Sequence, residues 1–114
     1  MMELHSFKEY QEFNEDKFTK RVIFNEGGST VFVLNFMPGQ QLAPHKHPGS
    51  EVYLYVVTGS GTVIIDGTET QVSTQDVIHS GGDGLLSFTN NGSEPASLYV
   101  VLSKTPSKEY AKDI

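Results

Sequence analysis

The chain alternates short runs of β-branched and aromatic residues with turn signals, and no long run shows a helical period. Valine, isoleucine, threonine, phenylalanine and tyrosine favour strands, and short runs of them between turns are typical of antiparallel sheets. This pattern predicts strands over 21–25, 30–36, 51–57, 62–66, 76–80 and 97–103. The turn dipeptides between them are Gly27-Gly28, Asp66-Gly67, Gly81-Gly82 and Asn91-Gly92. We therefore expect an all-β sandwich or small barrel.

The two ends of the chain depart from this pattern. Four large apolar residues near the start are spaced three apart, which fits one face of a helix: Leu4, Phe7, Tyr10 and Phe13. Residues 1–18 are therefore predicted to dock as a short helix or an extra strand beside a β-barrel over 19–104. The polar residues 105–114 are predicted to fray. A chain of 114 residues without internal repeats predicts a single domain.

Charge and cysteine content exclude several classes of function. Fourteen acidic and eight basic residues give a net charge of −6, which disfavours nucleic acid and anionic membrane as partners. The one local group of cations, Lys17, Lys20 and Arg21, is better explained as a solvated strand edge. Without cysteine, any metal needs nitrogen and oxygen ligands. Because the sequence shows no secretory signal and no membrane-spanning run, we expect a cytoplasmic protein.

One stretch, APHKHPGSE over residues 43–51, carries candidate chemistry. In an extended strand His45 and His47 point to the same face, because side chains alternate with a period of two. A tight turn at Pro48-Gly49 returns the chain, so that Glu51 can complete a triad. Two imidazoles and one carboxylate suit a divalent transition metal and leave positions open for water or substrate. The spacing alone fits a chance pair of histidines on a solvated loop equally well.

A family resemblance favours the metal site. The segment from Pro38 to Gln71 resembles the first signature of the cupin superfamily, G-x5-H-x-H-x3,4-E-x6-G. The residues in register with it are Gly39, His45, His47 and Glu51. Asp66-Gly67, Gln75-Asp76 and Asn90 look like the second signature, so the resemblance covers residues 37–95. It implies a cupin-type double-stranded β-helix, or jelly-roll barrel, with the two histidines and the glutamate as metal ligands in the lumen.

The resemblance implies a class of protein and not one reaction. The metal would be iron, manganese, nickel, zinc, copper or cobalt, and cupins include oxygenases, isomerases, decarboxylases and non-catalytic proteins. The first hypothesis is a metalloenzyme that acts on a small molecule. The alternative is a non-catalytic cupin that binds a small ligand through a reduced or vestigial site, and a third is a structural dimer. The resemblance also favours a homodimer, for which residues 22–24 and 98–102 supply apolar surface.

The sequence departs from the cupin pattern at two places. Seven residues separate Glu51 from Gly59 where the pattern has six, so we expect a β-bulge in that strand. The family's fourth ligand is a histidine four residues before the asparagine, and here that position is Leu86. His79, on the preceding strand, is the candidate replacement ligand if it faces the lumen, and a surface histidine if it faces outward.

Three aromatic residues are candidates to line the lumen, with an ordinary core position as the alternative for each: Tyr53, Tyr55 and Phe88. His5 lies in the N-terminal segment and is expected at the surface.

Overall fold

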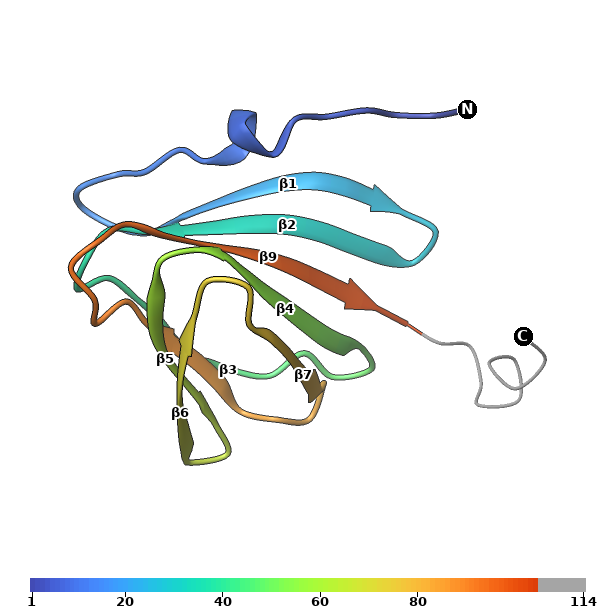
Figure 1. Cartoon of the computed structure of the whole chain (residues 1–114). Helices are drawn as coiled ribbons and strands as arrows, with labels where there is room; N and C mark the ends of the chain where they lie inside the picture. The colour runs from blue at the N-terminus through green and yellow to red at the C-terminus, as the bar shows by residue number, and fades with distance from the viewer. Residues whose placement is uncertain (105–114) are drawn as a thin grey trace.

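A computed structural model of the chain describes residues 1–104, and the predicted frayed tail over 105–114 lies outside them. Within the described part, one short 3-10 helix, η1 (Phe7–Tyr10), precedes nine strands (Figure 1). The strands are β1 (Thr19–Glu26), β2 (Ser29–Phe36), β3 (Gln41–His45), β4 (Glu51–Thr58), β5 (Ser60–Ile65), β6 (Thr68–Ser73), β7 (Val77–Gly81), β8 (Leu86–Thr89) and β9 (Ala96–Ser103). All six predicted runs are strands, and β3, β6 and β8 are strands that are not among the predicted runs.

The strands form two antiparallel sheets. One has five strands in the order β1-β2-β9-β4-β7, and the other has four in the order β3-β8-β5-β6. The chain passes repeatedly from one sheet to the other, which is the connectivity of a jelly roll (Figure 1). The all-β, double-stranded β-helix prediction is therefore confirmed. Asp66 and Gly67 both have positive φ, 49° and 83°, in the two-residue turn that joins β5 to β6, as the Asp-Gly dipeptide predicts.

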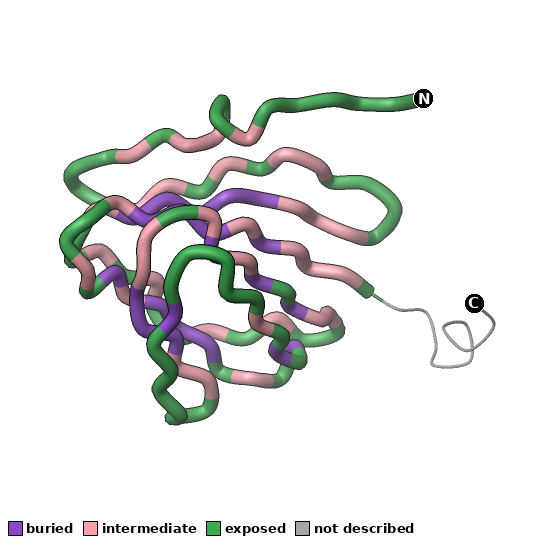
Figure 2. The backbone as a smooth tube through the Cα atoms, viewed as in Figure 1, coloured by how far each residue is buried: buried purple, intermediate pink, exposed green. Residues whose placement is uncertain are grey.

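The core lies between the two sheets, and alternate residues of the strands fill it (Figure 2). Phe36 and Phe88, from opposite sheets, are both 0% exposed and their ring centroids are 4.8 Å apart. On β4 the buried residues are Val52, Leu54 and Val56. Because strand side chains alternate between faces, the odd-numbered residues at the start of β4 face away from the core.

The predicted β-bulge is present in β4. Val56 pairs with Leu98 and Thr58 with Ser97, so one residue of β4 has no partner on β9. The bulge precedes Gly59, which has a φ of +85°, and a Cβ on this glycine would lie 2.7 Å from the Cα of Ala96. Because the extra residue lies at the far end of β4, it leaves the alternation from Glu51 to Val56 unchanged.

The N-terminal segment docks on the outer face of the five-stranded sheet, but it is not the helix that its apolar spacing predicts. Only η1 has helical backbone. The carbonyl oxygens that a longer helix would use are bonded by side chains of the sheet and its loops. The amide of Asn35 donates to the Tyr10 oxygen at 2.7 Å, and that of Gln40 donates to the Asn14 oxygen at 2.7 Å. These tertiary bonds replace the helical ones.

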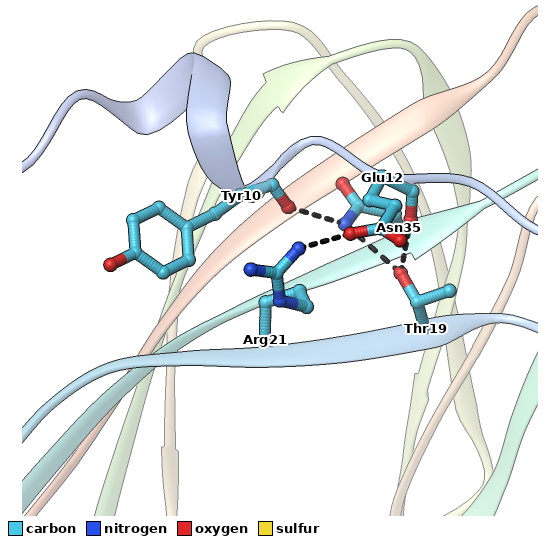
Figure 3. A network of polar contacts seen from close by, with 5 residues as sticks. All are labelled: Tyr10, Glu12, Thr19, Arg21 and Asn35. Carbon is cyan, nitrogen blue, oxygen red and sulfur yellow. Dashed lines mark hydrogen bonds and ion pairs between the residues drawn. The ribbon is translucent and has the colours of Figure 1, made fainter.

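The docked segment is also fixed by charge (Figure 3). Arg21 on β1 pairs with Glu12, and the Thr19 hydroxyl donates to the Glu12 carbonyl oxygen. Arg21 also lies 5.3 Å from the centroid of the Tyr10 ring, within range of a cation–π contact. These contacts leave the opposite, inner face of β1 open toward the barrel.

Candidate functional site

A cavity of about 110 Å³ lies between the two sheets. Its lining residues are Phe18, Lys20, Phe32, Leu34, Leu42, His45, His47, Val52, Leu54, Leu86 and Val100. Apart from one lysine and two histidines these are carbon side chains, and no carboxylate is among the described residues that line it. The lumen is therefore an apolar pocket with a small nitrogen-bearing region.

The two histidines of APHKHPGSE converge, as predicted. Their Nε2 atoms are 3.1 Å apart, and the Nδ1 of His45 lies 2.9 Å from the Ala43 carbonyl oxygen. When both rings are neutral, His45 Nδ1–H donates to Ala43, so His45 Nε2 accepts from His47 Nε2–H. The His47 backbone N–H donates to the Gly82 carbonyl oxygen at 2.8 Å and ties this turn to the loop after β7. The imidazole pair is thus held by both side-chain and backbone bonds.

Glu51 does not join this pair. It opens β4 next to the inward-facing Val52, so its carboxylate points to the outer face of the sheet. There its Oε1 accepts a bond of 2.7 Å from His79 Nε2. The expected triad of His45, His47 and Glu51 therefore does not form. The correction follows from strand alternation, which places the carboxylate on the other side of β4.

His79 is likewise on the outer face, so of the two alternatives it is the surface histidine, and the candidate replacement ligand is corrected. On β7 the inward side chains are Ile78 and the buried Ser80, whereas Val77 and His79 are exposed. His79 pairs in register with Tyr53 of β4, and their ring centroids are 5.1 Å apart. Its side chain is 52% exposed and that of Glu51 is 41% exposed, so their ion pair is a surface pair of small energetic weight.

The comparisons with known proteins agree with this architecture. The family model described as Cupin domain matches residues 32–102, which is more than half of the chain. The chain is a cupin. A search of curated proteins found no match. No described helix has the length and apolar character required to cross a membrane.

Solved structures similar to this cupin span nearly the whole chain. The TT1209 protein of Thermus thermophilus is 24% identical with a TM-score of 0.85, and the match covers 92% of this chain and 100% of that one. A Klebsiella pneumoniae protein with a double-stranded β-helix domain is 22% identical with a TM-score of 0.84, and the match covers 93% of each chain. An RmlC-like cupin from Desulfovibrio desulfuricans is 17% identical with a TM-score of 0.81, covering 90% of this chain and 97% of that one. At these identities the likeness concerns the fold.

Two carbon side chains occupy the inward positions where the cupin signatures have the remaining ligands. The first signature allows four residues between the second histidine and the glutamate, and six more before the glycine. Counted back from Gly59, the glutamate position in this spacing is Val52, which is 2% exposed and lines the cavity. Leu86, at the fourth-ligand position, is 3% exposed, lines the same cavity and pairs in register with His45. Val52 was not identified from the sequence as the glutamate position, although the spacing between His47 and Gly59 allows it.

The donor atoms of this cupin therefore do not fit the expected three-ligand centre. Within residues 1–104 no group of three or more histidine, aspartate or glutamate side chains is placed to hold a metal ion. The two imidazoles alone suit a metal, because ligand nitrogens at about 2.0–2.1 Å from an ion lie roughly 3 Å from each other when adjacent. Whether this pair binds a metal stays a prediction.

The three aromatic candidates do not line the lumen. Phe88 belongs to the core, and Tyr53 and Tyr55 are on the outer face. With Tyr99 and Val101 they border a shallow apolar hollow of about 420 Å³ over β4, β7 and β9. The predicted apolar run 98–102 contributes to this hollow, and the homodimer that it was expected to support stays a prediction.

The site predicts a pH dependence of stability. The pKa of His47 is lowered from 6.5 by burial first, and then by His45 and Lys20. The unfolded chain therefore takes up the His47 proton at a higher pH than the folded chain does, and the free energy of unfolding should decrease as the pH falls below 6.5. Urea unfolding over a pH series with a chelator present measures this. His47→Gln should flatten the dependence and the remote His5→Gln should not, so equal slopes for wild type and His47→Gln would contradict the assignment.

Proposed function

We propose that this cupin binds a small molecule in its lumen without a three-ligand metal centre. The observation that carries this proposal is the identity of the inward residues, because Val52 and Leu86 lie where a metal-dependent cupin has a carboxylate and a histidine. Their carbon side chains supply van der Waals contact and exclude water. The non-catalytic alternative of the sequence analysis is thereby favoured over an oxygenase, isomerase or decarboxylase.

The chemistry of the lumen supports ligand binding. Ligand pockets are typically apolar, with a few polar groups that fix orientation. Here Leu42, Leu54 and Val100 supply apolar wall, and the two histidines supply the polar groups. The volume of about 110 Å³ is well below that of a pocket for a drug-sized molecule, so the ligand is small.

A second candidate function, metal-dependent chemistry, rests on the imidazole pair. The Nε2 distance of 3.1 Å suits two adjacent ligands, and the bond from His45 Nδ1 to Ala43 is of the kind that orients a metal-binding histidine. A divalent ion held there would act as a Lewis acid toward a bound small molecule. With two protein ligands we expect weak and poorly selective binding among iron, manganese, nickel, zinc, copper and cobalt.

The two candidates are separated by ligand binding in the presence of a chelator. The probes are 1-butanol, butyramide and butyrate, and their binding is measured by ¹⁵N NMR. Amides around the cavity should shift saturably for at least one probe with a chelator present. Leu42→Trp should abolish the shifts by filling the cavity that this partly buried residue lines, whereas Leu4→Trp, at a site 89% exposed, should preserve them. Shifts that require added Zn²⁺ would favour the metal-dependent function, and no shift around the cavity in either condition would overturn the proposal.

A further inference from the structure

The nitrogen-bearing region of the lumen is positively charged, although the chain as a whole has a net charge of −6. Lys20, His45 and His47 line one cavity, and the acidic side chain nearest in sequence to the two histidines, Glu51, is turned to the outer face. Lys20 contributes to the lowered pKa of His47, after burial and His45, so its charge acts on the His47 imidazole. A ligand in this cavity therefore meets a field that favours negative charge.

Lys20 is exposed on β1, an edge strand, as the sequence suggests, but it also lines the cavity. It pairs in register with Leu34, and Leu34 is buried, so both side chains belong to the inner face of β1 and β2. Its ammonium nitrogen lies 4.5 Å from the centroid of the Phe32 ring, which holds the charge over the cavity wall. In the described part of the chain no carboxylate forms an ion pair with Lys20, whereas its neighbour Arg21 pairs with Glu12.

The rest of the cavity lining limits the chemistry of the remainder of the ligand. Apart from Lys20 and the two histidines, the lining consists of apolar side chains that offer no hydrogen-bond partner: Phe18, Phe32, Leu34, Leu42, Val52, Leu54, Leu86 and Val100. A second charged or strongly polar group placed there would be buried unpaired at a high cost in free energy. Since a cavity of about 150 Å³ holds benzene, one of about 110 Å³ accepts roughly four to six non-hydrogen atoms.

We propose that the lumen ligand is a short-chain monocarboxylate, with its carboxylate bound by Lys20 and the imidazole pair and its alkyl part against Val52, Leu54 and Leu86. This inference rests on the proposed function and adds the chemical class of the ligand. Lys20 supplies the charge-assisted contact to one carboxylate oxygen, and the other oxygen accepts from His47 Nε2–H, which turns from His45 Nε2 to the ligand when the ligand binds.

The test compares butyrate with butyramide, its neutral counterpart of nearly the same shape, by ¹⁵N NMR titration with a chelator present. In the wild type butyrate should bind roughly ten times more tightly than butyramide, the factor expected for a charge-assisted hydrogen bond. Lys20→Met keeps most of the apolar stem and removes the charge, so it should reduce this ratio to near one. Lys17→Met removes an equal charge from an exposed site that does not line the cavity, so it should leave the ratio unchanged.

The outcomes separate this inference from the proposed function. Equal binding of butyrate and butyramide around the wild-type cavity overturns the monocarboxylate class and leaves lumen binding standing. An unchanged preference in Lys20→Met overturns the role of Lys20, provided that the variant keeps the wild-type amide spectrum. Butyrate-induced shifts confined to the outer hollow, at Tyr99 and Val101, also overturn the inference. Absence of shifts from all four-carbon probes overturns the proposed function itself.

Discussion

The Val52→Glu variant should bind Zn²⁺ at least about 10- to 100-fold more tightly than the wild type, because it adds a carboxylate beside the two imidazoles. Loss of a group that only orients a metal ligand typically weakens binding by this factor, and a direct ligand contributes at least as much. Residue 52 lines the same cavity as both histidines, so its side chain shares the lumen with them. Competition with a chromophoric chelator measures the affinity.

The matched control for this variant is Glu51→Ala. Because the Glu51 carboxylate faces His79 on the outer surface, its removal should leave Zn²⁺ affinity unchanged. A buried carboxylate without a partner destabilises the fold, so Zn²⁺ should raise the melting temperature of Val52→Glu by more than that of the wild type. Leu86→His in the same background should tighten binding further. Zn²⁺ binding that is lost in Glu51→Ala and unimproved in Val52→Glu would contradict the assigned faces of β4.

The sequence was sufficient to predict most of the fold because its strands are half buried and bounded by turns. All six predicted runs are strands, since β-branched and aromatic residues recur in each of them. β6 was missed because Val72 alone of its six residues is buried, so its pattern is that of a polar surface. β8 was missed because it has four residues and directly follows a glycine-rich loop.

The candidate site was predicted only in part, because its composition depends on strand parity. The histidine pair follows from a two-residue spacing that any extended segment preserves. Which residue of β4 faces the lumen at the glutamate position depends on where the extra residue before Gly59 lies. A shift of one residue exchanges Glu51 for Val52 in the lumen. The bulge lies after Val56, and its position is set by pairing with β9, about forty residues away.

Two other features that the sequence did not determine have tertiary causes. His79 faces outward because the pairing of β7 with β4 places it opposite Tyr53, and neither strand alone defines that register. The apolar spacing in the N-terminal segment does favour a helix. Long-range hydrogen bonds from Asn35 and Gln40 to its carbonyl oxygens override this local preference.

Replacement of Asn35 should be the most destabilising single change in the contact between the N-terminal segment and the sheet. Asn35 is 0% exposed, and its amide donates to the Tyr10 oxygen at 2.7 Å and to the Thr19 hydroxyl oxygen at 3.1 Å. Its Oδ1 accepts from the Ser97 hydroxyl at 2.7 Å (Figure 3 shows the part with Tyr10 and Thr19). Asn35→Ala removes three hydrogen bonds and leaves the Tyr10 carbonyl and the Ser97 hydroxyl without these partners.

We expect Asn35→Ala to lower the free energy of unfolding by about 2–4 kcal/mol, because each buried group left unsatisfied costs about 1–3 kcal/mol. Urea unfolding measures this loss, and Asn25→Ala, at an exposed site, should change stability by less than about 0.5 kcal/mol. Trypsin should also cleave Asn35→Ala faster at Lys8, because the docked segment detaches before the barrel unfolds. Adding Ser97→Ala should recover part of the loss by removing one of the unsatisfied groups. A loss as small as that of Asn25→Ala, with unchanged proteolysis, would mean that the N-terminal segment is held by its apolar side chains and the Arg21–Glu12 pair instead.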